Sequence, residues 1–127
     1  VAINKPKRLV PPRKDVRKSP RVIVDSPLAF QCLEGKQILP TEHTGRIVDL
    51  SYGGIFAMSP VQLDVQQEIK ITLSLSLMSH QSSTVYAKVI RTNKLEDHWD
   101  VNLEFTAIHH EAQAAIKDFV DEQIERI

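Results

Sequence analysis

The sequence is poor in cysteine and in long apolar runs. Its 127 residues include one cysteine, Cys32, so no disulfide can form within the chain and a reducing compartment is the simpler environment for it. No apolar run reaches the roughly 18 residues that a membrane-spanning helix needs, and no stretch resembles a signal peptide. We therefore expect a cytoplasmic protein with no membrane segment in this chain.

The residue patterns of common active sites are also missing. No serine or cysteine lies in a nucleophile elbow, and no pair of carboxylates stands out as acid and base. His109-His110-Glu111 lacks the i, i+4 histidine spacing of a helical zinc site, and the other histidines form no ligand pattern. We expect a protein that is not an enzyme and that carries no metal or cofactor.

The composition is that of one ordinary globular domain. Hydrophobic residues make up 42% of the chain and charged residues 25%, and the length is enough to bury a single core. The chain begins with Val1 rather than methionine. We therefore expect a processed protein or a piece of a longer one, and a further membrane or effector domain in the parent protein stays open.

The formal net charge of zero conceals a segregation of charge. Residues 1–21 carry eight Lys and Arg against one acidic residue, whereas residues 94–127 carry nine Asp and Glu against three basic residues. A positive N-terminal arm indicates contact with an anion. That anion is a ligand, a nucleic acid, a membrane surface or the acidic end of the chain itself.

Short alternating runs of apolar residues predict a β-rich domain. The first 12 residues contain three prolines and no apolar period, so residues 1–12 are expected to form a flexible leader and residues 13–127 the domain. The clearest period of two lies over 69–77. Six strands are predicted, from about Val22 to Leu33, over 38–50 with an interruption at Pro40, and over 54–58, 69–77, 85–91 and 101–105.

The period changes at the C-terminus. Apolar residues from Ile108 to Ile124 fall at helical spacing with acidic residues opposite, which predicts an amphipathic helix over about 109–126. Its apolar stripe is expected to pack over an open end or face of the sheet. Since no helix is predicted between the strands, the sheet is expected to be antiparallel and to close, or nearly close, on itself.

Two short segments carry the chemistry of a guanine and phosphate site. Arg17-Lys18-Ser19-Pro20-Arg21 places two guanidinium groups on the arm, and guanidinium grips phosphate or the O6/N7 edge of guanine with two parallel bonds. In 49–54, Asp49 and Ser51 offer a carboxylate and a hydroxyl, and Gly53-Gly54 allows a close backbone approach. The alternative is a strand-ending turn in which Asp49 and Ser51 bond their own backbone.

This pair of segments resembles the PilZ domain, whose motif is R-x-x-x-R followed by [D/N]-x-S-x-x-G. The matching residues are Arg17, Arg21, Asp49, Ser51 and Gly54. The resemblance implies a mainly β fold, a six-stranded antiparallel split β-barrel with a C-terminal amphipathic α-helix. The chain departs from the family at 100–105, where the family often has G-x-G-L-x-F and this chain has a polar side chain, Asn102, without an assigned role.

The resemblance also implies a ligand, the bacterial second messenger cyclic di-GMP. By the resemblance, Asp49 and Ser51 contact guanine, and Gly54 allows the backbone to approach the ligand closely. The role of Gly53 is less defined, because the motif leaves that position variable. Arg13 and Arg17 form a second R-x-x-x-R, so Arg13 is a further candidate contact. The arm is expected to close over the barrel and to switch a protein partner or a fused effector domain.

Two other functions remain open. A small barrel that binds single-stranded nucleic acid would also use a basic arm, but the chain has only four Phe, two Tyr and one Trp, several of them needed for the core, so few remain for base stacking. Nucleic acid is therefore the less favoured partner. The other alternative is a PilZ-like scaffold that has lost its ligand, against which the retention of all five motif positions argues.

Overall fold

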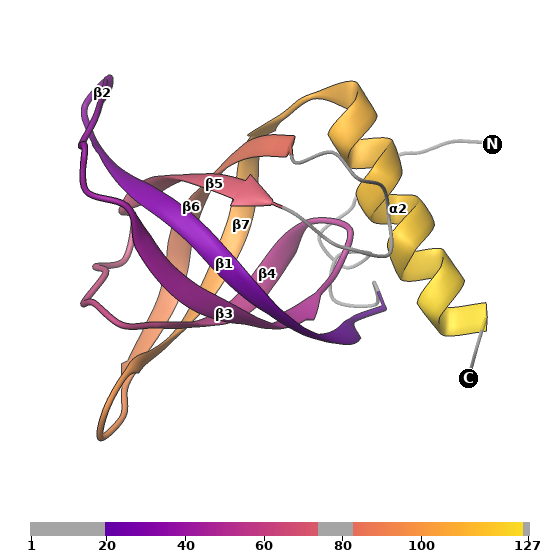
Figure 1. The fold of residues 1–127 in the computed structure, drawn as a ribbon, viewed down its shortest axis with the longest axis horizontal. Coiled ribbons are helices and arrows are strands. Elements are labelled where there is room, and N and C mark those ends of the chain that lie inside the picture. Colours follow the sequence, from indigo (N-terminus) through magenta and orange to yellow (C-terminus); the bar gives the residue numbers. More distant parts are fainter. Residues whose placement is uncertain (1–19, 74–82, 126–127) are drawn as a thin grey trace, which may run out of the picture.

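A computed structural model describes residues 20–73 and 83–125 of the chain. Seven strands are followed by one helix (Figure 1). The strands are β1 (Val22–Glu34), β2 (Gln37–Ile38), β3 (His43–Leu50), β4 (Gly54–Ser59), β5 (Glu68–Leu73), β6 (Ser83–Lys94) and β7 (Trp99–Ile108), and the helix is α2 (His110–Glu125).

Six of the strands close into an antiparallel barrel, as predicted. The order is β1-β3-β4-β7-β6-β5, and β5 pairs back with β1, so each of these strands has two neighbours within the ring. Alternating residues point inward where the strands are regular; in β5, Ile69, Ile71 and Leu73 are buried while the residues between them are not. The short β2 lies outside this ring and pairs only with the end of β1.

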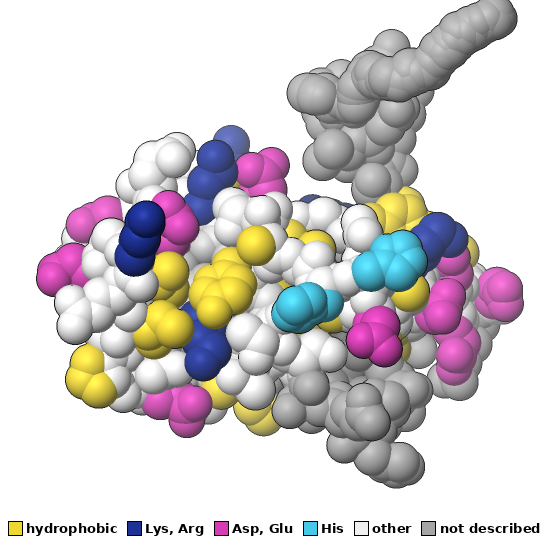
Figure 2. Space-filling model, turned by 90° about the horizontal axis from the view of Figure 1, so that it is seen from above, with side chains coloured by type: hydrophobic (Ala, Val, Ile, Leu, Met, Phe, Trp, Pro, Cys, Tyr) yellow, Lys and Arg dark blue, Asp and Glu magenta, His cyan; other side chains and the backbone are white. Residues whose placement is uncertain are grey.

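The helix α2 covers one end of the barrel (Figure 1). Its apolar stripe is buried there, through Ala112, Ile116, Phe119 and Val120. The expected role of the helix as a cover is therefore confirmed. Figure 2 shows acidic side chains at the end of the molecule where α2 lies and also at the opposite end. The exposed residues of α2 include Glu111, Asp118, Glu122 and Glu125, so the helix presents a negative face outward.

One predicted boundary is wrong. The strand expected over 38–50 is two strands, β2 and β3, separated by residues 39–42. Pro40 has no backbone N–H to donate, so the ladder stops there. Leu39 still donates its N–H to the Cys32 carbonyl at 2.9 Å, which ties the hairpin of β1 and β2. The predicted leader, 1–12, and the end of the strand expected over 69–77 lie outside the described residues.

Candidate nucleotide-binding site

The site begins with a β-bulge that turns Asp49 outward. In the ladder between β3 and β4, Ile47 pairs with Ala57 and Asp49 pairs with Phe56, so Val48 is an extra residue. Strict alternation from the buried Ile47 would turn Asp49 into the core. The bulge shifts the alternation by one residue, and such shifts commonly re-aim a functional side chain. The Asp49 side chain is 22% exposed as a result.

Arg21 meets Asp49 on the outer wall of the barrel. The Arg21 Nε donates to Asp49 Oδ1 at 2.8 Å, and Nη2 lies 2.7 Å from the same oxygen. Arg21 directly precedes β1, where Ile23 is the register partner of Asp49. The second arginine of the first motif and the aspartate of the second are therefore in contact. A guanidinium and a carboxylate side by side offer donors and acceptors to one ligand edge.

Ser51 lies at the start of the tight turn that links β3 to β4. Its backbone N–H donates to the Gly54 carbonyl at 3.0 Å, and its hydroxyl donates to the same carbonyl at 3.3 Å. The residue is only 5% exposed. The alternative of a strand-ending turn therefore holds for Ser51, whose hydroxyl bonds the backbone of the same turn. It does not hold for Asp49, whose carboxylate bonds Arg21.

The two glycines of the turn have different surroundings. A Cβ on Gly54 would lie 2.1 Å from the Leu103 carbonyl oxygen, so glycine is required for β4 to approach β7. A Cβ on Gly53 would have no heavy atom within 4 Å. The Cα of Gly53 therefore faces open space, although its carbonyl accepts the Phe105 N–H at 2.9 Å. The close approach at Gly54 is to a neighbouring strand.

Tyr52, at the tip of the turn, connects the motif to α2. Its hydroxyl donates to Asp121 Oδ1, and Lys117 donates to the other oxygen of the same carboxylate at 2.8 Å. The Lys117 Nζ also lies 5.7 Å from the centroid of the Tyr52 ring. The bond to Asp121 raises the pKa of Tyr52, and Lys117, followed by Tyr52, lowers the pKa of Asp121.

Two side chains without an expected role extend in register from Asp49 across the next two strands. Phe56 is its register partner on β4, and Asn102 is the partner of Phe56 on β7. Both are half-buried, while the adjacent Ile55 and Leu103 point into the core. Because neighbouring strands lie about 4.8 Å apart, a base held at Asp49 would have Phe56 within reach. The alternation of Ile55 and Ala57 around Phe56 was the signal that placed its ring outside.

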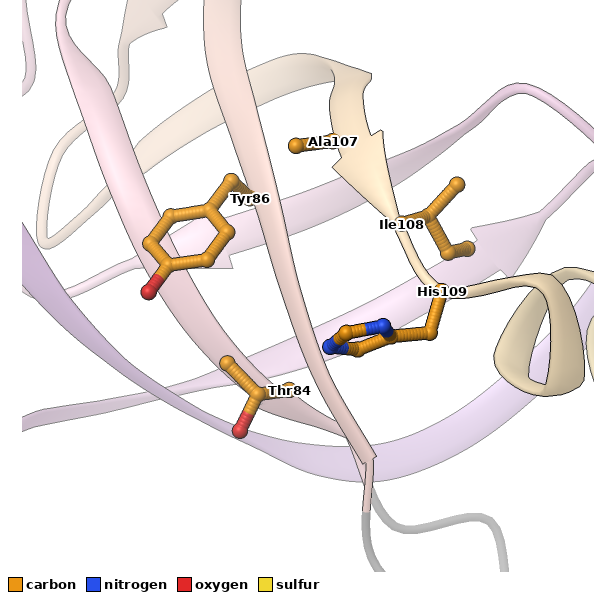
Figure 3. A pocket seen from close by; sticks show the side chains of 5 residues that line it. All are labelled: Thr84, Tyr86, Ala107, Ile108 and His109. Atoms are coloured by element: carbon orange, nitrogen blue, oxygen red, sulfur yellow. The ribbon is translucent and has the colours of Figure 1, made fainter.

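The candidate site lies on the outer wall of the barrel. A hollow of about 250 Å³ lies elsewhere, lined by Thr84, Tyr86, Ala107, Ile108 and His109. Figure 3 shows Thr84 and Tyr86 on β6 and the His109 ring at the junction of β7 and α2. Of the predicted site residues that the structure describes, none lines this hollow. Arg13 and Arg17 lie outside the described residues.

The comparison with protein families identifies the chain. A family model described as PilZ domain matches residues 15–122, which includes both motifs and all seven strands. This protein belongs to the PilZ family. The match covers most of the chain, and the closed barrel with its C-terminal helix agrees with the fold expected from the two motifs.

Solved structures, among them a PilZ domain, have a similar fold. The PilZ domain of YcgR from Escherichia coli, solved with c-di-GMP, has a TM-score of 0.58 at 13% identity and covers 87% of this chain and 92% of its own. The K. pneumonia MrkH-c-di-GMP complex has a TM-score of 0.65 at 15% identity and covers 87% of this chain and 52% of its own. The Bacillus subtilis inhibitor of motility MotI/DgrA has a TM-score of 0.61 at 20% identity and covers 91% of this chain and 56% of its own.

The PilZ chain is shorter than some of these neighbours. It spans about half the length of the MotI and MrkH chains. No curated protein matches it in sequence. In the part of the chain that the structure describes, no helix is both long and apolar enough for a membrane crossing. The same residues contain no group of three or more His, Cys, Asp or Glu that could hold a metal ion.

Proposed function

We propose that this PilZ domain is a receptor for cyclic di-GMP. The observation that carries the proposal is the contact between Arg21 and Asp49, which joins the two motifs on the outer wall of the barrel. Guanine presents the O6 and N7 acceptors on one edge and N–H donors beside them. The guanidinium of Arg21 complements the acceptors, and the carboxylate of Asp49 complements the donors.

The neighbouring groups suit the rest of the ligand. The open space beside the Cα of Gly53 gives a phosphate or sugar room to approach, and the Ser51 hydroxyl can bond the ligand in place of the Gly54 carbonyl. Phe56 supplies an aromatic ring beside Asp49, on which a base can rest. The complexes of YcgR and MrkH with c-di-GMP support the choice of ligand, since both have this fold.

The proposal extends to Arg13 and Arg17 on the arm. In it, Arg17 bonds a phosphate, Arg13 adds a further contact, and the arm closes over the bound nucleotide. Ordering the arm costs conformational entropy, so ligand affinity and arm position are linked. The domain of residues 13–127 thereby switches a protein partner or a fused effector domain and acts as a binding module in the cytoplasm rather than as an enzyme.

A calorimetric comparison of ligands tests the proposal. Cyclic di-GMP is expected to bind at least about tenfold more tightly than cyclic di-AMP, because adenine lacks the O6 acceptor and the adjacent ring N–H donor. A single-stranded oligonucleotide, titrated at two salt concentrations, serves as the third ligand. Equal binding of the two cyclic dinucleotides, or preferred oligonucleotide binding with a steep salt dependence, would contradict the proposal.

A further inference from the structure

The turn that carries the second motif is bonded to the C-terminal helix through Tyr52. Figure 1 shows the turn between β3 and β4 beside α2. The hydroxyl of Tyr52 donates to Asp121, a residue 69 positions later in the chain. Tyr52 also packs against the buried core with part of its ring. A side chain in the middle of the motif, between Ser51 and Gly53, therefore contacts the helix rather than the site.

Asp121 is well placed to hold this contact. Its second oxygen accepts a bond from Lys117, one helical turn earlier, at 2.8 Å. Lys117 lies within cation–π distance of the Tyr52 ring, with Nζ 5.7 Å from the centroid. Two side chains of α2 thus hold one tyrosine, by a charge-assisted hydrogen bond at its hydroxyl and by a cation at its ring.

The opposite face of α2 is fixed in the end of the barrel. Ile116, Phe119 and Val120 are buried there, on the same two turns of helix that present Lys117 and Asp121. The turn is equally constrained on its own side, because the Ser51 N–H bonds the Gly54 carbonyl. A change in the shape of the turn would therefore displace Tyr52, and a displaced Tyr52 would alter the contact with α2.

We infer that Tyr52 is a positioning residue of the nucleotide site and that α2 responds to ligand through its bond to Asp121. The inference rests on the proposed function, since the ligand is cyclic di-GMP. With the bond in place, the turn is held in one shape before ligand arrives, which lowers the entropy that binding must overcome. Coupling is reciprocal, so a ligand that holds the turn also holds α2 more firmly on the barrel.

The test compares Tyr52→Phe with Tyr86→Phe. Tyr52→Phe keeps the ring and removes the hydroxyl, and Asp121→Asn removes the charge from the other partner. Tyr86→Phe is the matched control, since Tyr86 is the only other tyrosine and lies on β6, away from the turn. Two quantities are measured for each variant: the affinity for cyclic di-GMP by calorimetry, and amide hydrogen exchange across α2 with and without ligand.

We expect Tyr52→Phe and Asp121→Asn to weaken binding by about three- to tenfold, as for the loss of one hydrogen bond. In wild type, ligand should slow exchange in α2, and both variants should reduce this slowing. Tyr86→Phe should match wild type in both measurements. The double variant should lose little more affinity than either single variant, because both remove the same bond.

The outcomes separate the inference from the proposed function. If wild type binds cyclic di-GMP but Tyr52→Phe binds equally well with the same protection of α2, the coupling is refuted and the proposed function stands. If wild type binds no cyclic di-GMP, the proposed function fails and the coupling fails with it. If affinity falls equally in Tyr86→Phe and Tyr52→Phe, the effect is not specific to the bond with Asp121 and the coupling is again refuted.

Discussion

The carboxylate of Asp49 accepts a hydrogen bond from the Arg21 Nε at 2.8 Å, although the two residues lie 28 positions apart in the chain. A second pair of the same kind joins β3 to β1, where Arg46 Nε donates to Asp25 Oδ1 at 3.0 Å. Both pairs are exposed and both link β1 to β3 or the residue before β1. Only the first pair belongs to the two motifs, so variants of the second pair serve as controls for variants of the first.

Arg21→Ala is expected to separate stability from binding. Surface ion pairs contribute about 0–1 kcal/mol, and the Arg21 side chain is 45% exposed, so the free energy of unfolding should fall by less than about 1 kcal/mol. The affinity for cyclic di-GMP should fall by at least about tenfold, because a charge-assisted bond to the ligand is lost. Denaturant unfolding and calorimetry measure the two effects. Arg46→Ala should give the same small loss of stability without loss of affinity.

Ser51→Ala should reduce both stability and affinity. The variant leaves the Gly54 carbonyl without its side-chain donor, which should cost about 1 kcal/mol and lower Tm by a few degrees. Ser59→Ala is the matched control, because the Ser59 hydroxyl is also buried and bonds the Val61 carbonyl at 2.6 Å. A similar loss of affinity in both variants would mean that Ser51 acts only through the fold.

Alanine at Gly53 and at Gly54 should have opposite consequences. Gly54→Ala brings a Cβ against the Leu103 carbonyl, so unfolding should become easier by about 1–3 kcal/mol or more. Gly45→Ala is its control outside the motif, with a Cβ 2.2 Å from the Met58 carbonyl oxygen. Gly53→Ala meets no atom and should leave Tm nearly unchanged while weakening ligand binding. Full affinity in Gly53→Ala would show that the ligand does not approach this backbone.

The hairpin of β6 and β7 should make a pH-dependent contribution to stability. His98 contacts Asp97 at 2.7 Å and Asp100 at 3.1 Å, and the bond to Asp97 is the main reason that the pKa of His98 is raised. A raised folded pKa stabilises the protein below the unfolded value of about 6.5, and the effect is lost as pH rises through the folded pKa. His98 in turn lowers the pKa of Asp97, whose contribution is lost as pH falls below about 4.

The stabilisation should therefore be greatest between about pH 4 and 6.5. NMR titration of the His98 ring should give a pKa above its ordinary value, and Asp97→Asn should lower it. In denaturant unfolding, the free energy of unfolding of wild type should increase when the pH is lowered to slightly acidic values. The increase should be smaller in His98→Gln. An unchanged pH profile in His98→Gln would refute the role of this residue.

Much of the barrel could be predicted because its strands have one buried face and one face toward solvent. The alternation over β5 predicted a half-buried strand, and the helical spacing after Ile108 predicted the cover of the barrel. The boundary between β2 and β3 differs from the prediction, because Pro40 ends a strand where the apolar pattern alone indicates only an interruption.

The site was predictable in part. The contact of Arg21 with Asp49 follows from the two motifs, but the bulge at Val48 does not, because a period of two carries no sign of an extra residue. Phe56 could have been placed outward from its buried neighbours. The bond from Tyr52 to Asp121 depends on where α2 docks, and no local pattern encodes a contact between such distant positions.

Calorimetric titration of cyclic di-GMP into wild type, Asp49→Ala and Asp25→Ala tests the central claim most directly. Asp49 and Asp25 each pair with an arginine on the outer wall, so the two variants remove equivalent charges. We expect Asp25→Ala to bind as wild type does and Asp49→Ala to bind at least about tenfold more weakly. Equal affinity in Asp49→Ala and wild type, or no binding to the folded wild-type protein, would contradict the account.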